Sequence, residues 1–374
     1  MIPTISTIPI IQLASGDRLS IQVYKFIGAQ PGKKVYLQAN LHGAEIVGNA
    51  VIHQMIEFLM TLDDTQLAGE IWLVPVCNPL SANQRTHYFS TGRYNVYDGK
   101  DWNRIFWDYE KKYDFLAAFA QSQLNFQSND IRKNYLELIT DTFDKELTKL
   151  NSPSGLPFNE RYRYQLQFLC LDANYVIDLH SSSNQAIDYL YCFHSREDSA
   201  RAFLLEYGIL MKKNEYDGDA FDEAFMKPWL ALEDKLAELG KQIRFDVESW
   251  TLELGSGMQM NPESVNKGVI GIKNYLIYKG VLNLPGFPFS LQEVIFTQKS
   301  KIKKYYAPVG GMIQGRVQLG SSVEAGQRLY QILNFSKQEE VPALINICAE
   351  QAGLVFDTST NYAVNEGEYV LSIM

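Results

Sequence analysis

The fold of this chain is decided by the stretch VYLQANLHGAE, residues 35–45. Its first seven residues form a largely apolar run with the length of a buried strand, and residues 45–61 carry apolar side chains at helical spacing. A similar run opens the stretch YVIDLH, residues 175–180. Each of these two stretches therefore places a histidine, His42 or His180, at the end of a predicted strand.

Strands and helices alternate along the first 290 residues. The further predicted elements are strands at 70–76, 189–193 and 243–254 and helices at 221–239 and 262–280. This alternation indicates an α/β fold with a mostly parallel or mixed sheet flanked by helices. Because sites in such sheets form beyond the carboxyl ends of the strands, we expect His42 and His180 at one site.

Residues 107–165 have a different composition, rich in charged and aromatic side chains. Helical patterns at 111–125 and 130–149, followed by a break at 151–155, predict a helical insertion between the two histidine-bearing stretches. The insertion could cover the cleft, bind a partner subunit or only decorate the surface.

A second domain is predicted at residues 291–374, which leaves residues 1–290 as the first. This part contains an internal repeat, with one copy from Gly311 to Ile332 and the other from Gly353 to Ile373. Each copy begins with a glycine, contains the turn sequence Val-x-x-Gly and ends with an isoleucine. Two such halves suggest a small quasi-symmetric β domain, and the pattern resembles the biotinyl/lipoyl hammerhead. Neither copy has the lysine hairpin that carries the cofactor in those domains, so covalent attachment of a cofactor is not expected.

The overall composition limits the classes of partner. A net charge of -9 and a pI near 5.2 argue against nucleic acid. No apolar run reaches the ~20 residues of a membrane-spanning helix, and the first residues do not resemble a signal peptide. Four scattered cysteines favour reduced thiols in a cytoplasmic protein. We expect a small-molecule partner and no membrane, with homo-oligomer formation left open.

Two imidazoles and one carboxylate at strand ends are what a catalytic zinc site needs, because it uses three protein ligands and leaves a fourth position open. Glu45 follows His42 by three residues and is predicted in the first helical turn, after a tight turn at Gly43. His-x-x-Glu alone is a common pattern. The second stretch, with Asp178 and His180, makes a metal site the stronger interpretation, although hydrogen bonds alone could satisfy a histidine there.

The segment RYNVYDGKDWNR, residues 93–104, is the second group of reactive side chains. The planar guanidinium of arginine matches a carboxylate, so adjacent Asn103 and Arg104 suit a substrate with a terminal carboxylate. Asp101 could orient a metal-bound histidine. The alternative is a loop held together by local salt bridges.

Glu253 is the third element of the predicted site, at the end of a largely buried strand. A carboxylate there can take a proton from water and pass it to a leaving amine. Glu248 is the weaker candidate because it would lie deeper in the sheet. Alternatively, Glu253 could only pair with a nearby arginine.

Four motifs occur in the order found in the succinylglutamate desuccinylase/aspartoacylase family, which is related to the zinc carboxypeptidases. They are His-Gly-x-Glu at 42–45, Gly-Arg-Tyr-Asn to Asn-Arg-x-Phe at 92–106, Asp-Leu-His at 178–180 and Glu-Leu-Gly at 253–255. The chain resembles this family over most of residues 35–106, 175–182 and 243–281, and in its terminal β domain.

The resemblance implies one Zn²⁺ per chain and a role for each matching residue. The implied zinc ligands are His42, Glu45 and His180. Glu253 is the implied general base and proton shuttle, and Arg93 would polarise the scissile carbonyl. Asn103 and Arg104 would bind the substrate carboxylate. Asp101 would support the first histidine. Arg85 is an alternative to Arg93. Trp102 and the insertion after Phe106 depart from the family pattern and bear on the substrate rather than the reaction.

These observations predict a zinc-dependent hydrolase that cleaves the amide bond of a small N-acyl amino acid or related carboxylate. One alternative is a metallocarboxypeptidase acting on peptides or cell-wall fragments, which would need an open cleft. A second alternative is a binding protein that keeps the fold without turnover.

Overall fold

The computed structural model describes residues 1–374 apart from 85–89, 107–113, 151–157, 214 and 336–340. Its centre is a nine-stranded sheet in the order β1-β2-β4-β3-β5-β9-β7-β8-β10. The strands are β1 (Thr4–Gln12), β2 (Arg18–Ile27), β4 (Ala68–Val74), β3 (Gln30–Ala39), β5 (Tyr175–Ser182), β9 (Glu248–Ser256), β7 (Asp188–Phe193), β8 (Tyr207–Met211) and β10 (Ile295–Gln298). The central neighbours β4, β3, β5 and β9 run parallel, whereas β1, β2 and β7 join antiparallel partners. The predicted mixed α/β sheet is confirmed.

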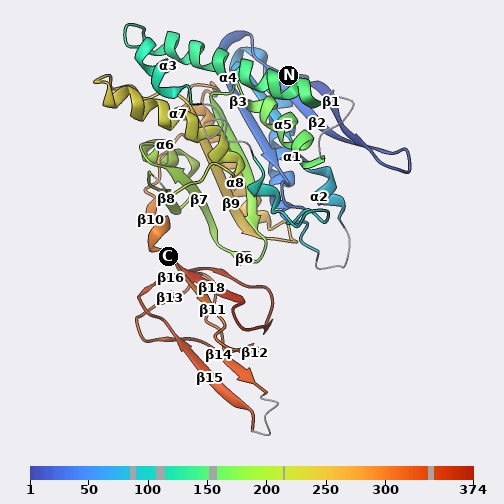
Figure 1. The fold of residues 1–374 in the computed structure, drawn as a ribbon, viewed down its shortest axis with the longest axis vertical. Helices are drawn as coiled ribbons and strands as arrows, with labels where there is room; N and C mark the ends of the chain where they lie inside the picture. Colours follow the sequence, from blue (N-terminus) through green and yellow to red (C-terminus); the bar gives the residue numbers. More distant parts are fainter. Residues whose placement is uncertain (85–89, 107–113, 151–157, 214, 336–340) are drawn as a thin grey trace.

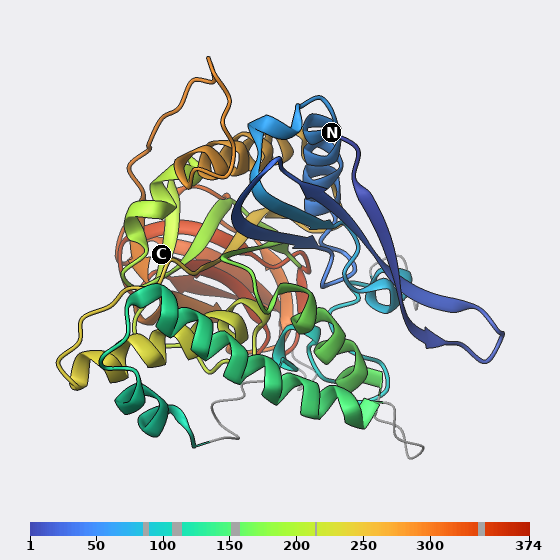
Figure 2. The same ribbon diagram turned by 90° about the horizontal axis from the view of Figure 1, so that it is seen from above.

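Helices cover both faces of this sheet, and Figure 2 shows the two helical layers from above. The main helices are α1 (Val47–Met60) and α8 (Pro262–Tyr278) on one face, and α4 (Ser128–Leu150), α5 (Phe158–Cys170) and α7 (Phe221–Glu238) on the other. Successive residues of a strand point to opposite faces, so Val35 and Leu37 enter the core beneath α1 whereas Tyr36 enters the core beneath α5 and α7. The central strands are therefore buried on both sides, as their apolar sequences indicate.

Several element boundaries differ from those that the sequence predicts. The first helix begins at Val47, so Glu45 precedes it and does not lie in its first turn. The strand predicted at 243–254 begins only at Glu248. The insertion contains the short helix α3 (Leu116–Ser122), α4 and the unpredicted α5. The whole break predicted at 151–155 lies outside the described residues, as does 107–113.

The C-terminal part consists of two antiparallel sheets, drawn below the large sheet in Figure 1. One contains β11 (Lys303–Tyr306), β18 (Tyr369–Ile373), β16 (Gly353–Thr358) and β13 (Ser322–Val323); the other contains β15 (Ala343–Cys348), β14 (Arg328–Asn334), β12 (Gly311–Gln314) and β17 (Ala363–Val364). The two sequence repeats exchange strands, because β12 of the first pairs with β17 of the second while β13 pairs with β16. This exchange gives the repeats one common core. The hammerhead resemblance itself stays a prediction.

Several contacts join the C-terminal sheets to the rest of the chain. The short strand β6 (Gln185–Ala186) leaves the end of β5 and pairs with β16. Strand β10 follows residue 290 in the chain but pairs with β8 at the edge of the large sheet. The division into domains at residues 290 and 291 stays a prediction. Within the described residues, no helix has the length and apolar character needed to cross a membrane.

Candidate active site

The two histidines meet because their strands are neighbours. Strands β3 and β5 run parallel with Ala39 opposite Leu179, so the segments that follow them leave the sheet at the same edge. After β3, Asn40 takes a left-handed conformation with φ of 66°. Its side-chain amide donates to the carbonyl oxygens of His42 and Gly43, which fixes the turn that carries His42.

Gly43 is required because the loop packs closely against a neighbouring helix. A Cβ atom at this position would lie 2.2 Å from the carbonyl oxygen of Ser81. Ser81 belongs to the short helix α2 (Pro79–Asn83), which is capped by the Asn78 side chain. The loop between His42 and Glu45 therefore rests directly on the backbone of α2.

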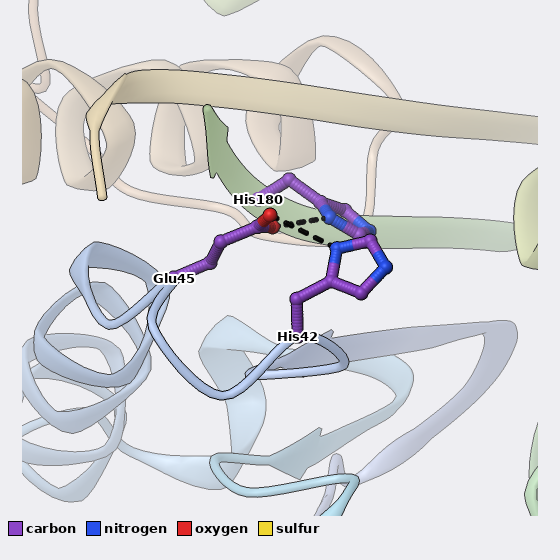
Figure 3. Close-up of side chains that lie close together, drawn as sticks. All are labelled: His42, Glu45 and His180. Atoms are coloured by element: carbon purple, nitrogen blue, oxygen red, sulfur yellow. Dashed lines mark hydrogen bonds and ion pairs between the residues drawn. The ribbon is translucent and has the colours of Figure 1, made fainter. Parts of the chain in front are cut away.

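His42, Glu45 and His180 form a compact cluster of potential metal ligands (Figure 3). The Nδ1 atom of His42 lies 2.9 Å from Glu45 Oε1, and the Nδ1 atom of His180 lies 2.7 Å from Glu45 Oε2. All three side chains are buried. Their ligand atoms lie within 4.8 Å of one another, as one ion would need.

A carboxylate supports each histidine from behind. His42 Nε2 lies 3.0 Å from Asp101 Oδ1, and His180 Nε2 lies 2.9 Å from Asp178 Oδ2. If each Nε2–H donates to its carboxylate, each Nδ1 turns a lone pair toward the oxygens of Glu45. Two lone pairs facing a carboxylate require a proton or a metal ion between them, so this donor set fits a divalent cation such as zinc.

Sequence reasoning assigned no supporting role to Asp178. The signal was present in the motif, because residues two apart on a strand share one face and Asp178 precedes His180 by two.

The charges of the cluster also suit a cation. Burial alone would lower the pKa of His42, but the Glu45 and Asp101 carboxylates raise it above its usual value. Burial likewise opposes a charge on His180, but Asp178 and Glu45 raise its pKa well above the usual value. The two histidines in turn hold the pKa of Glu45 well below its usual range, against the effect of burial.

Arg93 is tied to the cluster on two sides. Its Nε atom lies 2.8 Å from Asp101 Oδ2, and its Nη1 donates to Ser183 Oγ at 3.1 Å. Ser183 Oγ in turn donates to Glu45 Oε1 at 2.9 Å. Asp101 therefore bridges Arg93 and His42. The alternative residue, Arg85, lies outside the described residues.

Asn103 and Arg104 follow Asp101 in a 3₁₀ turn, η2 (Trp102–Arg104), whose N-terminus Asp101 caps through the Asn103 N–H. The side-chain oxygen of Asn103 accepts from the N–H of Phe221 at 2.8 Å. This bond leaves the NH₂ group of Asn103 to serve as the donor toward a ligand.

Glu253 enters the site from the next strand. It lies opposite His180 in the β5–β9 pairing. Its Oε2 atom is buried and has no hydrogen-bond partner in the described part of the chain. Burial raises the pKa of Glu253 to about 7, although His180 opposes this effect. The competing candidate Glu248 lies at the other end of β9 and is already bonded to Ser199, Tyr275 and Lys279.

The chain is similar to proteins of known structure along its whole length. Residues 31–151 match the model of the succinylglutamate desuccinylase/aspartoacylase catalytic domain. A structure from Shewanella frigidimarina NCIMB 400 that is named after this family shares 28% identity at a TM-score of 0.89 and covers 100% of this chain and 97% of its own. Another, from Shewanella amazonensis SB2B, shares 28% identity at a TM-score of 0.86 and covers 99% and 98%.

The resemblance to the succinylglutamate desuccinylase/aspartoacylase family is confirmed. A further structure named after this family, from Rhodobacter sphaeroides, shares 17% identity at a TM-score of 0.67 over 100% of this chain and 94% of its own, and supports the fold alone. No curated protein matches the chain. The family is one of hydrolases, and the four motifs of this chain that resemble it converge on one site.

All predicted site residues except Asp101 line one cavity of about 650 Å³. The residues are His42, Glu45, Arg93, Asn103, Arg104, His180 and Glu253. Sequence reasoning missed the opposite wall, which comes from the C-terminal sheets and includes Lys304, Tyr306, Asp357 and Tyr369. No local motif marks these residues, because contacts between distant parts of the chain, such as the β6–β16 pairing and the Ser182–Asp357 hydrogen bond, bring them to the site.

Proposed function

We propose that this chain is a zinc-dependent hydrolase that cleaves the amide bond of a small N-acyl amino acid or related carboxylate. The observation that carries the proposal is the placement of Glu253. Its unbonded carboxylate oxygen lies beside a cluster of metal-ligand type, in a cavity that also holds two arginines. Such a hydrolysis needs a general base, a cation site and residues that bind the substrate carboxylate, and this cavity contains candidates for all three.

His42, Glu45 and His180 would hold one Zn²⁺ per chain. Bound zinc supplies a Lewis-acidic charge that can lower the pKa of a water molecule to about 7. Asp101 and Asp178 keep the histidine rings oriented through their Nε2 atoms.

Glu253 would move the proton in both halves of the reaction. With its pKa near 7, it can accept a proton from the attacking water and return it to the leaving amine nitrogen. The Arg93 guanidinium would stabilise the negative charge that develops on the carbonyl oxygen. The bonds to Asp101 and Ser183 hold Arg93 ready for this role, so it need not reorganise during the reaction.

Asn103 and Arg104 would bind the substrate carboxylate. The Asn103 NH₂ group has no hydrogen-bond partner among the described residues and can donate to the substrate, and the Arg104 guanidinium supplies the positive charge. A cavity of about 650 Å³, walled on one side by the C-terminal sheets, has the size typical of small-molecule sites. This size favours a small N-acyl amino acid over a peptide or a cell-wall fragment. We also propose a cytoplasmic location, which the four free cysteines favour.

Glu253→Gln tests the proposal directly. The variant should keep its zinc, because Glu253 is not among the proposed ligands, and should lose turnover by about 10²–10⁴-fold. Zinc content and amine release from a panel of N-acyl amino acids and short peptides are the two measurements. Glu248→Gln, on the same strand but outside the cavity, is the matched control and should keep turnover. Full activity of Glu253→Gln would rule out the mechanism, and preferential cleavage of peptides would favour a carboxypeptidase.

A further inference from the structure

A buried chain of hydrogen bonds continues behind His180 into the centre of the sheet. The hydroxyl of Tyr36 donates to Gln38 Oε1 at 3.1 Å, and Gln38 Nε2 donates to Asp178 Oδ1 at 3.0 Å. The other oxygen of Asp178 holds His180 Nε2. Tyr36, Gln38 and Asp178 are each 0% exposed.

The backbone brings these four side chains to one face. Tyr36 and Gln38 are two residues apart on β3, and Asp178 and His180 are two apart on β5. In the parallel pairing of these strands, Gln38 lies directly opposite Asp178. The alternation of strand side chains therefore lines up the whole chain of bonds without any loop.

The direction of these bonds follows from their chemistry. An ionised carboxylate can only accept, so Gln38 must turn its NH₂ group toward Asp178 and its oxygen toward Tyr36. The Tyr36 hydroxyl then donates to that oxygen and prevents the amide from turning over. With Oδ1 of Asp178 engaged by Gln38, Oδ2 remains for the N–H of His180.

Glutamine is seldom buried, and a buried amide must find partners for both of its polar ends. If the Gln38–Asp178 hydrogen bond had only a structural role, Asp178 would need no contact with the site. Here the second oxygen of Asp178 contacts His180, so one carboxylate links the Gln38 amide to a residue of the cluster of potential metal ligands.

We propose that Gln38 is a positioning residue for the metal site, acting through Asp178 on the orientation of the His180 ring. This inference rests on the proposed function, because it requires that His180 binds the metal. Residues behind a metal ligand commonly change metal affinity by 10–100-fold when they are replaced. Gln38 contacts Asp178 and not His180 itself, so we expect a change in metal affinity near the lower end of that range.

Gln38→Met tests this role, because methionine has a similar length and no donor. We expect its Zn²⁺ affinity, measured by competition with a chromophoric chelator, to fall about tenfold. The visible absorption of the Co²⁺-substituted protein should also change, since it reports the geometry of the ligands. The matched control is Tyr275→Phe, which removes a buried 2.7 Å hydrogen bond to Glu248 elsewhere in the sheet. This control should lower stability and leave Zn²⁺ affinity and the Co²⁺ spectrum unchanged.

Tyr36→Phe is the milder second variant and decides the question if Gln38→Met does not fold. Without the hydroxyl, the amide is no longer held in one orientation, so Zn²⁺ affinity should fall several-fold. Zn²⁺ affinity equal to that of the unmodified protein in the folded variants would overturn the inference. If the unmodified protein itself binds no zinc, the proposed function fails first, and the two failures are thereby distinguished.

Discussion

Glu253 and Glu248 show how position alone separates two residues of one type on one strand. Both are on β9, but Glu248 receives hydrogen bonds from Ser199, Tyr275 and Lys279, which satisfy its charge. Glu253 has a buried oxygen without a partner among the described residues. A buried carboxylate oxygen left without a partner costs stability, and such a cost is typical of a group kept available for chemistry.

The raised pKa of Glu253 predicts the acid limb of the pH profile. Below its pKa of about 7 the carboxyl group is neutral and cannot accept a proton, so turnover should fall as the pH is lowered. A bound cation favours the ionised form, which places the midpoint at or below about 7. The measurement is kcat against pH at saturating zinc. A rate that stays constant well below pH 5 would contradict this role for Glu253.

At the scale of elements, the site depends on a loop that is folded onto a helix. The segment from His42 to Glu45 leaves β3 and lies against α2, with Gly43 in contact with the backbone of Ser81. The histidine is therefore positioned by packing between backbones rather than by the turn conformation alone.

Gly43→Ala should disturb this contact. Its new Cβ atom would lie 2.2 Å from a backbone oxygen, so the loop must shift, at a cost of about 1–3 kcal/mol. We expect a lower unfolding temperature and weaker Zn²⁺ binding. Gly310→Ala is the control, because the nearest atom to its Cβ would be 3.5 Å away. Unchanged zinc binding in Gly43→Ala would show that the loop tolerates the displacement.

At the scale of the whole molecule, the site has walls from two separate parts of the chain. Asp357, on β16, accepts hydrogen bonds from Ser182 at the end of β5 and from Tyr369 on β18. The neighbouring Ser183 contacts both Arg93 and Glu45. The C-terminal sheets are thus connected to the cluster of potential metal ligands through two adjacent serines.

Asp357→Ala should weaken this connection. Ser182 loses its acceptor, whereas Tyr369 keeps its contacts to the Asp357 carbonyl and to Ser372. The segment that carries Ser183 should therefore become less ordered, and kcat/KM should fall by about tenfold. The unfolding temperature should change little, because most of the β6–β16 backbone pairing remains. Asp141→Ala, at an exposed position on α4, is the control. Unaltered kinetics in Asp357→Ala would show that the C-terminal sheets only enclose the cavity.

The sequence predicted the sheet, most of its helices and the convergence of His42 and His180, because apolar periodicity records which elements are buried and parallel strands share an edge. Its motifs also nominated Glu253, Arg93, Asn103 and Arg104, all of which line the cavity. It did not predict α5, strand β8 or the N-terminal pair β1 and β2. Amphipathic segments near the surface carry weaker patterns than central strands do.

What the sequence determined by itself was the chemistry at the ends of the strands, since residue type and local spacing depend on no distant contact. Only the tertiary structure decided which groups complete that chemistry. The Gln38–Asp178 bond needs the register between β3 and β5, and the Asp357 wall needs the pairing of β6 with β16. These contacts join residues more than 100 positions apart, and their partners are selected by packing rather than by any local pattern.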